Sequence, residues 1–205
     1  ECDLCIMKPE TCHYHLGTCR EDEFAHKVCF QPHIVYLANS SALKIGITRI
    51  VNMPTRWLDQ GATQALPILK VGSRRLSGHL ETLFGTQIAD KTDWRKLLKG
   101  EAEPLNLIEQ RDQILEEFAP KIQTIRDEFS QNLEFNEELE FLEHELPKEF
   151  IYPVEQYPEK IKSLNLDKTP KIRGVLHGIK GQYLLLDIGV INIRKYTGYE
   201  MILRT

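Results

Sequence analysis

The feature that most constrains this chain is the concentration of metal-binding side chains at its N-terminus. All five cysteines and four of the seven histidines lie within the first 33 of 205 residues, and no cysteine follows them. Zn²⁺ is bound tetrahedrally by thiolates and imidazoles, and a segment this short cannot build a hydrophobic core without such a staple. The sequence therefore predicts a structural zinc-binding knuckle over residues 1–33.

The spacing leaves two ligand sets open. One closed site takes three thiolates and one imidazole: Cys12, Cys19, Cys29 and His33. It leaves a C-x-x-C pair, the usual knuckle spacing across a tight turn, as half of a second site: Cys2 and Cys5. The alternative is a single all-thiolate site: Cys2, Cys5, Cys19 and Cys29. Because the chain begins at Glu1 within this run, we expect missing upstream residues to carry the other pair of ligands.

Disulfides and bystander thiols are the competing interpretations of these cysteines. An odd cysteine count, a long cysteine-free remainder and no signal peptide in view favour a reducing compartment, so we expect a cytoplasmic protein. The surplus of thiolates favours closed, structural coordination over catalytic zinc, which keeps one position open for water. The other histidines of the segment are expected to be bystanders: His13, His15 and His26.

Composition and charge limit the classes of partner that this chain can bind. With 41% hydrophobic and 27% charged residues the chain is ordinary globular material, and no apolar run approaches the roughly 18 residues of a membrane span. The net charge of −4 is uneven, because residues 101–150 carry 15 acidic and 4 basic side chains between two mildly basic flanks. These flanks permit a DNA or RNA partner without demanding one. A protein partner and the oligomeric state stay open.

The pattern along the chain predicts an α+β protein in four parts, with boundaries at residues 1–33, 34–100, 101–149 and 150–205. The second part is expected to be a small mixed α/β domain. Its predicted elements are a hairpin of strands His33–Ala38 and Leu43–Thr48, a helix from Pro54 running through PTRWLDQGATQAL, a strand Pro67–Val71, a helix at 78–89 capped by Ser77, and a short helix at 93–99.

The last two parts are expected to be a connector and a β module. Apolar periodicity predicts a long helix over 105–129 that Pro120 should kink or split. The acidic stretch 134–149 is interpreted as a solvated helical connector, with an acidic partner-binding tail as the alternative. Alternating apolar residues and glycines over 171–204 predict a small antiparallel β module, for which no motif indicates a function.

Two triplets, an arginine and a glutamate carry a resemblance to a known family. Ile34-Val35-Tyr36, Lys44-Ile45-Gly46, Arg56 on a helix and Glu81 on a later helix are similar in order and spacing to the GIY-YIG nuclease domain. The whole chain also resembles an uncharacterised bacterial zinc-knuckle domain family, through phrases such as VYLANSS, PTRWLDQGA, DKTDWR and GIKGQYLLLD.

The nuclease resemblance implies a role for each matched residue. Tyr36 would help to activate the attacking water, Arg56 would stabilise the pentacovalent phosphate, and Glu81 would hold one Mg²⁺. The sequence departs from the family pattern in three ways. The first triplet lacks its glycine, Lys44 stands where the second triplet has tyrosine, and the family's late asparagine has no clear counterpart.

Structural roles compete with these assignments. Tyr36 can be a core residue with a hydrogen-bonded hydroxyl, and Arg56 can form an ion pair with Asp59 or Glu81. Four further cations are either a phosphate-contacting rim or solvated charges: Arg49, Lys70, Arg74 and Arg75. The two tryptophans are expected to be packing anchors: Trp57 and Trp94.

Two functions from different classes follow. The first is a metal-dependent nuclease acting on DNA or RNA through Tyr36, Arg56 and Glu81, with Lys44 beside them. The second is a non-catalytic, zinc-containing module that binds nucleic acid or protein, since zinc knuckles and small β barrels are common nucleic-acid contacts. No phosphate-binding loop, dinucleotide fingerprint or zinc hydrolase signature is present.

Overall fold

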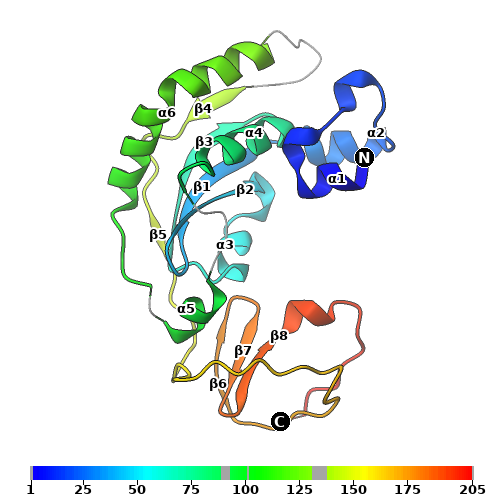
Figure 1. Cartoon of the computed structure of the whole chain (residues 1–205), viewed down its shortest axis with the longest axis vertical. Helices are drawn as coiled ribbons and strands as arrows, with labels where there is room; N and C mark the ends of the chain where they lie inside the picture. Colours follow the sequence, from blue (N-terminus) through cyan, green and yellow to red (C-terminus); the bar gives the residue numbers. More distant parts are fainter. Residues whose placement is uncertain (1, 89–92, 101, 131–137, 205) are drawn as a thin grey trace.

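The computed structural model describes residues 2–88, 93–100, 102–130 and 138–204, with side chains from Leu4 onward. It has mixed α and β structure, as predicted. A central sheet is covered by helices, a helical N-terminal segment packs at one end, and a second, three-stranded sheet lies at the other (Figure 1).

The central sheet is antiparallel and its middle strand is buried on both faces. Its strands run in the order β2-β1-β3-β4, with β5 also pairing with β3: β1 (His33–Asn39), β2 (Leu43–Arg49), β3 (Gln64–Val71), β4 (Leu139–Phe141) and β5 (Lys148–Glu149). In β1, Val35 and Leu37 face one hydrophobic cluster, while Ile34 and Tyr36 face another. Burial on both faces explains why the sequence of β1 is an almost unbroken apolar run. The predicted hairpin of β1 and β2 is confirmed.

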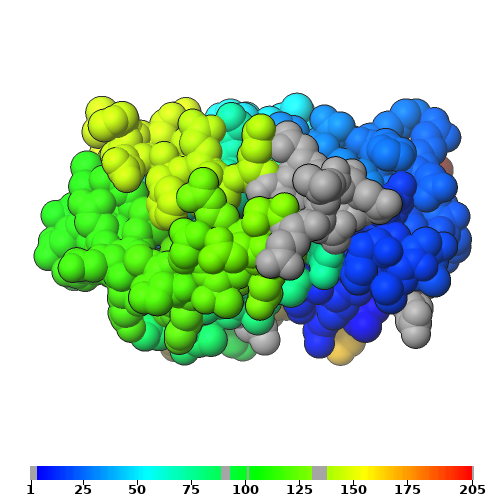
Figure 2. Space-filling model, turned by 90° about the horizontal axis from the view of Figure 1, so that it is seen from above, coloured from blue at the N-terminus to red at the C-terminus, as the bar shows by residue number. Residues whose placement is uncertain are grey.

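Helices provide the two covers of this sheet. The larger cluster contains α4 (Arg74–Phe84) and α6 (Leu107–Ser130), whose Phe84 and Phe118 rings meet edge to face at 5.4 Å. The other cluster contains α3 (Thr55–Asp59), which follows the 3₁₀ turn η4 (Ile50–Asn52). Seen from above, α6 and the strands after it occupy one side of the molecule and the N-terminal segment occupies the other (Figure 2).

Two helix boundaries differ from the sequence prediction. The helix after Pro54 ends at Asp59, because Gly61 takes a left-handed φ of 70° and the chain then enters β3. Helix α4 begins at Arg74 instead of 78, and its cap is Ser73, whose Oγ accepts a hydrogen bond from the Leu76 N–H at 3.1 Å. The prediction of Ser77 as cap was wrong, and the predicted helix end at 89 lies outside the described residues.

The acidic connector is only partly helical. Helix α6 runs through Pro120 without being split, as a single element of 24 residues. The helical interpretation of the stretch after it was wrong for residues 138–149, because β4 and β5 pair with β3 and extend the central sheet. Lys70 of β3 forms an ion pair with Glu140 of β4 at 2.9 Å, and the Arg111 guanidinium donates to the Glu143 carbonyl at 2.7 Å. Residues 134–137 lie outside the description.

The C-terminal sheet is antiparallel, as predicted, and it shares its core with a helix of the second part, 34–100. It contains β6 (Leu176–Lys180), β7 (Tyr183–Leu186) and β8 (Gly189–Asn192), followed by η5 (Ile193–Tyr196). Leu185 and Val190 pack against Leu97 and Leu98 of α5 (Trp94–Lys99), which begins one residue after its predicted start at Asp93, the N-cap. The strand expected near the end was wrong, since residues 197–204 form none.

The N-terminal segment is a chain of short helical turns that leans on α4. Its elements are α1 (Cys2–Met7), η1 (Pro9–Thr11), η2 (Tyr14–Leu16), α2 (Asp22–Phe24) and η3 (Ala25–Cys29). At Gly78 of α4 an added Cβ would lie 2.7 Å from the Glu10 amide nitrogen, so the two segments touch backbone to backbone. Cys2 and Cys5 lie on α1, so the predicted tight turn between them was wrong. Within the described ranges, no helix has the length and apolar character to cross a bilayer.

Candidate active site

The Tyr36 hydroxyl is the centre of a buried polar cluster. Tyr36 lies on β1 and is fully buried, and its hydroxyl donates to Gln60 Oε1 at 2.8 Å. Gly46 faces it across the β1–β2 ladder, where an added Cβ would lie 2.7 Å from the same hydroxyl oxygen. The glycine of the second triplet therefore makes room for the tyrosine of the first.

Lys44 and Gln60 complete the hydrogen bonding around this hydroxyl. The Lys44 Nζ donates to Gln60 Oε1 at 3.0 Å, although Lys44 is only 5% exposed. Gln60 was not predicted as a site residue. Gln60 is the C-cap of α3, four residues after Arg56, so the two side chains lie on the same side of the helix, and that spacing was the available signal.

Two opposite charges act on the same hydroxyl. The pKa of Tyr36 is raised to about 12, chiefly by burial; the charge of Arg56 and hydrogen bonds with Arg56 and Gln60 lower it, whereas the Glu81 carboxylate adds to the rise. The charges of Arg56 from α3 and Glu81 from α4 thus both act on Tyr36 from β1. None of the ion pairs found among the described residues includes Arg56, so its predicted pairing with Asp59 or Glu81 is not seen there.

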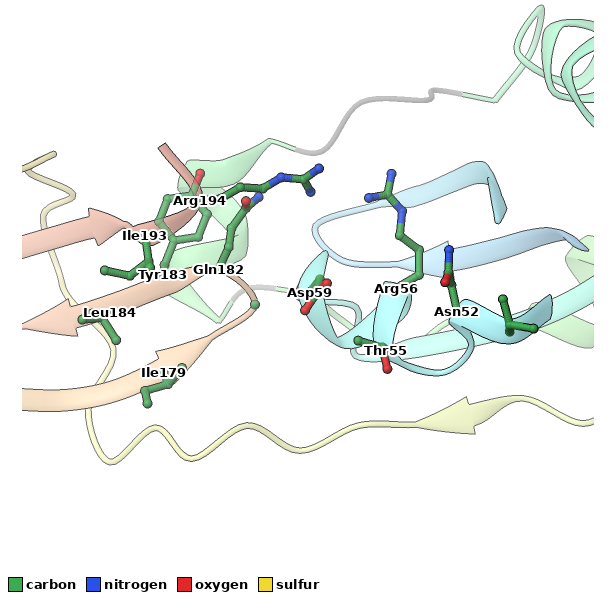
Figure 3. Close-up of a pocket in the computed structure, with 12 residues that line it drawn as sticks. Asn52, Thr55, Arg56, Asp59, Ile179, Gln182, Tyr183, Leu184, Ile193 and Arg194 are labelled. Carbon is green, nitrogen blue, oxygen red and sulfur yellow. The ribbon is translucent and has the colours of Figure 1, made fainter. Parts of the chain in front are cut away.

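Arg56 also opens onto a large cleft. The cleft has a volume of about 710 Å³ and lies between α3 and the C-terminal sheet (Figure 3). Asn52, Thr55 and Arg56 line one wall, and residues of β7 and η5 line the other. Tyr36, Lys44 and Glu81 are not among the lining residues, so Arg56 joins the buried cluster to the cleft.

The cluster offers a neutral hydroxyl, a guanidinium and a carboxylate in one place. A hard divalent ion that keeps most of its water ligands needs only one or two protein carboxylates, and half-buried Glu81 can supply one. A guanidinium binds phosphoryl or carboxyl oxygens through a planar fork of donors. The arrangement therefore suits chemistry on a charged oxygen centre.

Three of the four other predicted cations, and both tryptophans, have structural contacts. Arg74 donates to the Ile6 carbonyl at 2.5 Å and the Arg75 guanidinium lies 4.9 Å from the centre of the Phe129 ring. With Lys70 paired to Glu140, these cations do not form a free rim. The packing role predicted for Trp57 is confirmed by its complete burial. Half-buried Trp94 stacks on Tyr183.

Four of the predicted metal ligands line one small cavity. Cys5, Cys12, Cys19 and Cys29 line a space of about 100 Å³ in the N-terminal segment. The pKa of the Cys29 thiol is raised to about 11, chiefly by burial; the charge of Arg74 opposes the rise, and the other three cysteines add to it because like charges would gather there. The side chain of Cys2, in both predicted sets, lies outside the described residues.

His33 is not brought to these thiols. It lies at the start of β1, and its Nδ1 is 2.6 Å from the Gln31 carbonyl, to which it donates; it does not line the thiol cavity. Its Nε2 is buried without a hydrogen-bond partner, and burial lowers its pKa to about 4. Across the described part of the chain, no three His, Cys, Asp or Glu side chains are arranged to hold a metal ion.

Comparison with known proteins gives a family and no function. No curated protein and no solved structure matches the chain. A protein-family model matches residues 1–201, which is nearly the whole sequence, and this agrees with the resemblance to an uncharacterised domain family. The chain therefore belongs to the family described as "Protein of unknown function (DUF2797)".

Proposed function

We propose that this protein is a metal-dependent nuclease with a GIY-YIG-like scaffold that acts on DNA or RNA. The observation that carries the proposal is that the charges of Arg56 on α3 and Glu81 on α4 both act on the Tyr36 hydroxyl of β1. A structural tyrosine needs one hydrogen-bond partner, which Gln60 already provides. The additional pair of opposite charges is what phosphodiester cleavage would require.

Each side chain has a distinct task in this proposal. Arg56 stabilises the negative charge that builds on the non-bridging phosphate oxygens, because its guanidinium opens onto the cleft. Tyr36 is neutral at physiological pH, so its hydroxyl orients the attacking water by hydrogen bonding, while Gln60 and Lys44 fix the position of that hydroxyl. Mg²⁺ held by Glu81 would act as a Lewis acid toward phosphate oxygens when bound.

The test is a cleavage assay on a mixture of DNA and RNA with Mg²⁺ or Mn²⁺. We expect Glu81→Ala to reduce cleavage by about 100-fold or more, because the metal ligand is lost without opening the core. Glu116→Ala is the matched control, since Glu116 is an exposed carboxylate on α6, and it should cut like the wild type. Cleavage that persists in Glu81→Ala at the wild-type rate would contradict the assignment.

The second candidate is a non-catalytic module that binds nucleic acid or protein on the same scaffold. The observation that favours it is the complete burial of Tyr36, which does not line the cleft. Wild-type protein that binds nucleic acid but cuts none of the substrates with either metal would select this candidate and eliminate the nuclease.

We also propose that the four thiols of the N-terminal cavity hold one structural Zn²⁺. Four thiolates are a usual donor set for zinc, and this set combines parts of the two predicted ones: Cys5, Cys12, Cys19 and Cys29. The thiols would have to draw together around the ion. Reduced thiols of this kind fit a cytoplasmic location.

Elemental analysis of protein purified without added metal tests the zinc proposal. We expect about one zinc per chain, lost in Cys12→Ser and in Cys29→Ser and retained in His33→Gln, because His33 does not line the cavity. Folded wild-type protein with less than about half an equivalent of zinc would show that the thiols are bystanders.

A further inference from the structure

The cleft beside Arg56 has a second wall that the buried cluster does not explain. This wall belongs to the C-terminal sheet and contributes Gln182, Tyr183 and Arg194. These residues belong to the C-terminal part of the chain, for which no sequence motif indicates a function, and they differ in chemistry from the buried cluster around Tyr36. A cleft of about 710 Å³ is large enough for a nucleotide-sized ligand.

The two walls present like charges to one another. In Figure 3 the guanidinium of Arg194, from η5, points across the cleft toward that of Arg56, from α3. Asp59 carries the one carboxylate among the described residues that line the cleft, so the positive charge is in excess. No ion pair found in the described part of the chain includes either arginine. Two facing guanidiniums are stabilised when an anion lies between them.

The same wall holds an aromatic ring in a fixed orientation. The Tyr183 ring stacks on the Trp94 ring with 6.3 Å between centroids and 6° between planes. The Arg95 guanidinium lies 4.5 Å from the Trp94 ring centre, which extends the stack into α5. A preorganised aromatic ring beside an amide side chain, Gln182, is suited to stacking on a base and bonding to its edge.

The acidic part of the protein is kept away from this cleft. Helix α6 lies against the far part of the central sheet, and the C-terminal sheet lies at the opposite end of the molecule (Figure 1). A chain with a net charge of −4 therefore presents a locally cationic, aromatic cleft. A cationic cleft lined by an aromatic ring favours ligands that carry both phosphates and bases, that is, nucleotides or nucleic acid.

We propose that the cleft binds a single-stranded segment of nucleic acid, with successive phosphates at Arg56 and Arg194 and a base against Tyr183. The proposal rests on the proposed function, because Arg56 is shared with the buried cluster. A duplex keeps its base faces stacked internally, so only an unpaired strand can offer a base to Tyr183. The C-terminal sheet is thus the wall that holds the strand next to the reacting phosphate.

The test measures binding without catalysis. Fluorescence anisotropy of labelled single-stranded and duplex DNA and RNA is recorded with the full chain without added Mg²⁺ or Mn²⁺, which withholds the metal for cleavage and leaves the proposed structural Zn²⁺ in place. We expect single strands to bind at least about tenfold more tightly than duplexes, and Arg194→Ala to weaken that binding about tenfold and reduce the salt slope by about one. Lys195→Ala is the matched control, since Lys195 is an adjacent exposed cation that does not line the cleft, and it should bind within about twofold of wild type.

A second pair of variants separates stacking from the hydroxyl. Tyr183→Leu should weaken single-strand binding about tenfold, and Tyr183→Phe should retain it, because the ring carries the interaction.

Equal affinity for duplexes, equal loss in Lys195→Ala, or preferential binding of an acidic peptide such as polyglutamate would overturn the proposal. Single-strand binding that responds as expected, in a protein that never cuts, would support the cleft and defeat the nuclease. Cleavage that depends on Glu81 but not on Arg194 would support the nuclease and defeat the proposed role of the cleft.

Discussion

The central sheet, through the α3 helix packed on it, and the C-terminal sheet lie on opposite sides of the cleft, and they fix their side chains in different ways. The central sheet is packed between α3 on one face and α4 with α6 on the other, so Tyr36 is positioned from all sides. The C-terminal sheet has three short strands and is covered mainly by α5, which leaves Leu176 and Ile179 49% and 41% exposed. The position of the Tyr36 hydroxyl should therefore be sensitive to changes in core packing. The position of the second wall should be sensitive to the few contacts through which the C-terminal sheet docks.

Those docking contacts can be named. The Tyr152 hydroxyl lies 2.9 Å from the Ala62 carbonyl and 3.2 Å from the Leu58 carbonyl, both at the end of α3. At the tip of the β6–β7 hairpin, Gly181 has a left-handed φ of 56°, and an added Cβ would lie 2.8 Å from the Asp59 carbonyl oxygen. The orientation of the second wall thus depends on contacts with the same short helix that carries Arg56.

The largest effect is expected from the core beneath Tyr36. Trp57 is fully buried, with its ring edge-on to Tyr36 at 5.7 Å. Trp57→Ala should lower the free energy of unfolding by about 3–5 kcal/mol, measured by urea denaturation. Trp57→Phe should cost less, since it keeps most of the contact and removes an indole N–H that is buried without a partner. Leu58→Ala, at the exposed next position, is the control; an equal loss there would mean that α3 contributes no specific packing.

The next effect is acid destabilisation of the central sheet through His33. Its folded-state pKa of about 4 lies below the ordinary 6.5, so its contribution to stability is complete above pH 6.5 and is lost as the pH falls to 4. That shift corresponds to about 3 kcal/mol. Unfolding measured at pH 7.5 and pH 4 should show a smaller acid loss in His33→Phe than in wild type. The control His144→Gln changes an exposed histidine, and if it removes the same acid loss the assignment to His33 is wrong.

The contrast between the two sheets also explains what the sequence could predict. The β1–β2 hairpin, α5 and the antiparallel C-terminal module follow from local apolar patterns and turn residues, and the structure has them. The strands β4 and β5 were missed because their residues, such as Glu140 and Glu149, are acidic and exposed, and only pairing with β3 makes them strands. Long-range pairing of this kind leaves no periodic signal.

The candidate site divides in the same way. Tyr36, Arg56 and Glu81 could be selected from ordered motifs, and the fold brings them to one hydroxyl. Gln60 was missed although it bonds both Tyr36 and Lys44, because a glutamine at a helix end has no motif of its own. Arg194 and Tyr183 were missed because they reach the cleft through docking of a distant sheet.

Adding one methyl group at Gly46 tests the central side of the comparison. Gly46→Ala would place its Cβ within 2.8 Å of the Tyr36 ring, in a site with no room to relax. We expect a stability loss of about 1–3 kcal/mol and a loss of cleavage, because the hydroxyl must move. Single-strand binding should change little, since Tyr36 does not line the cleft. An unchanged cleavage rate in Gly46→Ala would show that the hydroxyl position is not needed.

Adding the same methyl group at Gly181 tests the other side. Gly181→Ala introduces a left-handed alanine against the Asp59 carbonyl, at a cost of about 1–2 kcal/mol confined to docking of the C-terminal sheet. We expect faster amide hydrogen exchange in β6 to β8, weaker single-strand binding and an unaltered central sheet. Gly198→Ala is the control, because Gly198 also has positive φ but no atom within 4 Å of an added Cβ. Slower exchange, or equal effects of both variants, would contradict the role given to the hairpin tip.

The smallest effect is expected at Lys180, the buried cation of the docking surface. Its ammonium lies 5.7 Å from the Tyr152 ring centre and 5.1 Å from the Tyr157 ring centre, and desolvation by burial lowers its pKa. Attraction to the rings and the cost of burying the charge oppose one another, so Lys180→Met, which keeps the stem, should change the free energy of unfolding by less than about 1 kcal/mol. Lys180→Ala should cost about 1–2 kcal/mol, because it also removes the packed methylene groups. A loss in Lys180→Met as large as in Lys180→Ala, measured by urea denaturation at pH 7.5, would mean that the charge itself docks the C-terminal sheet.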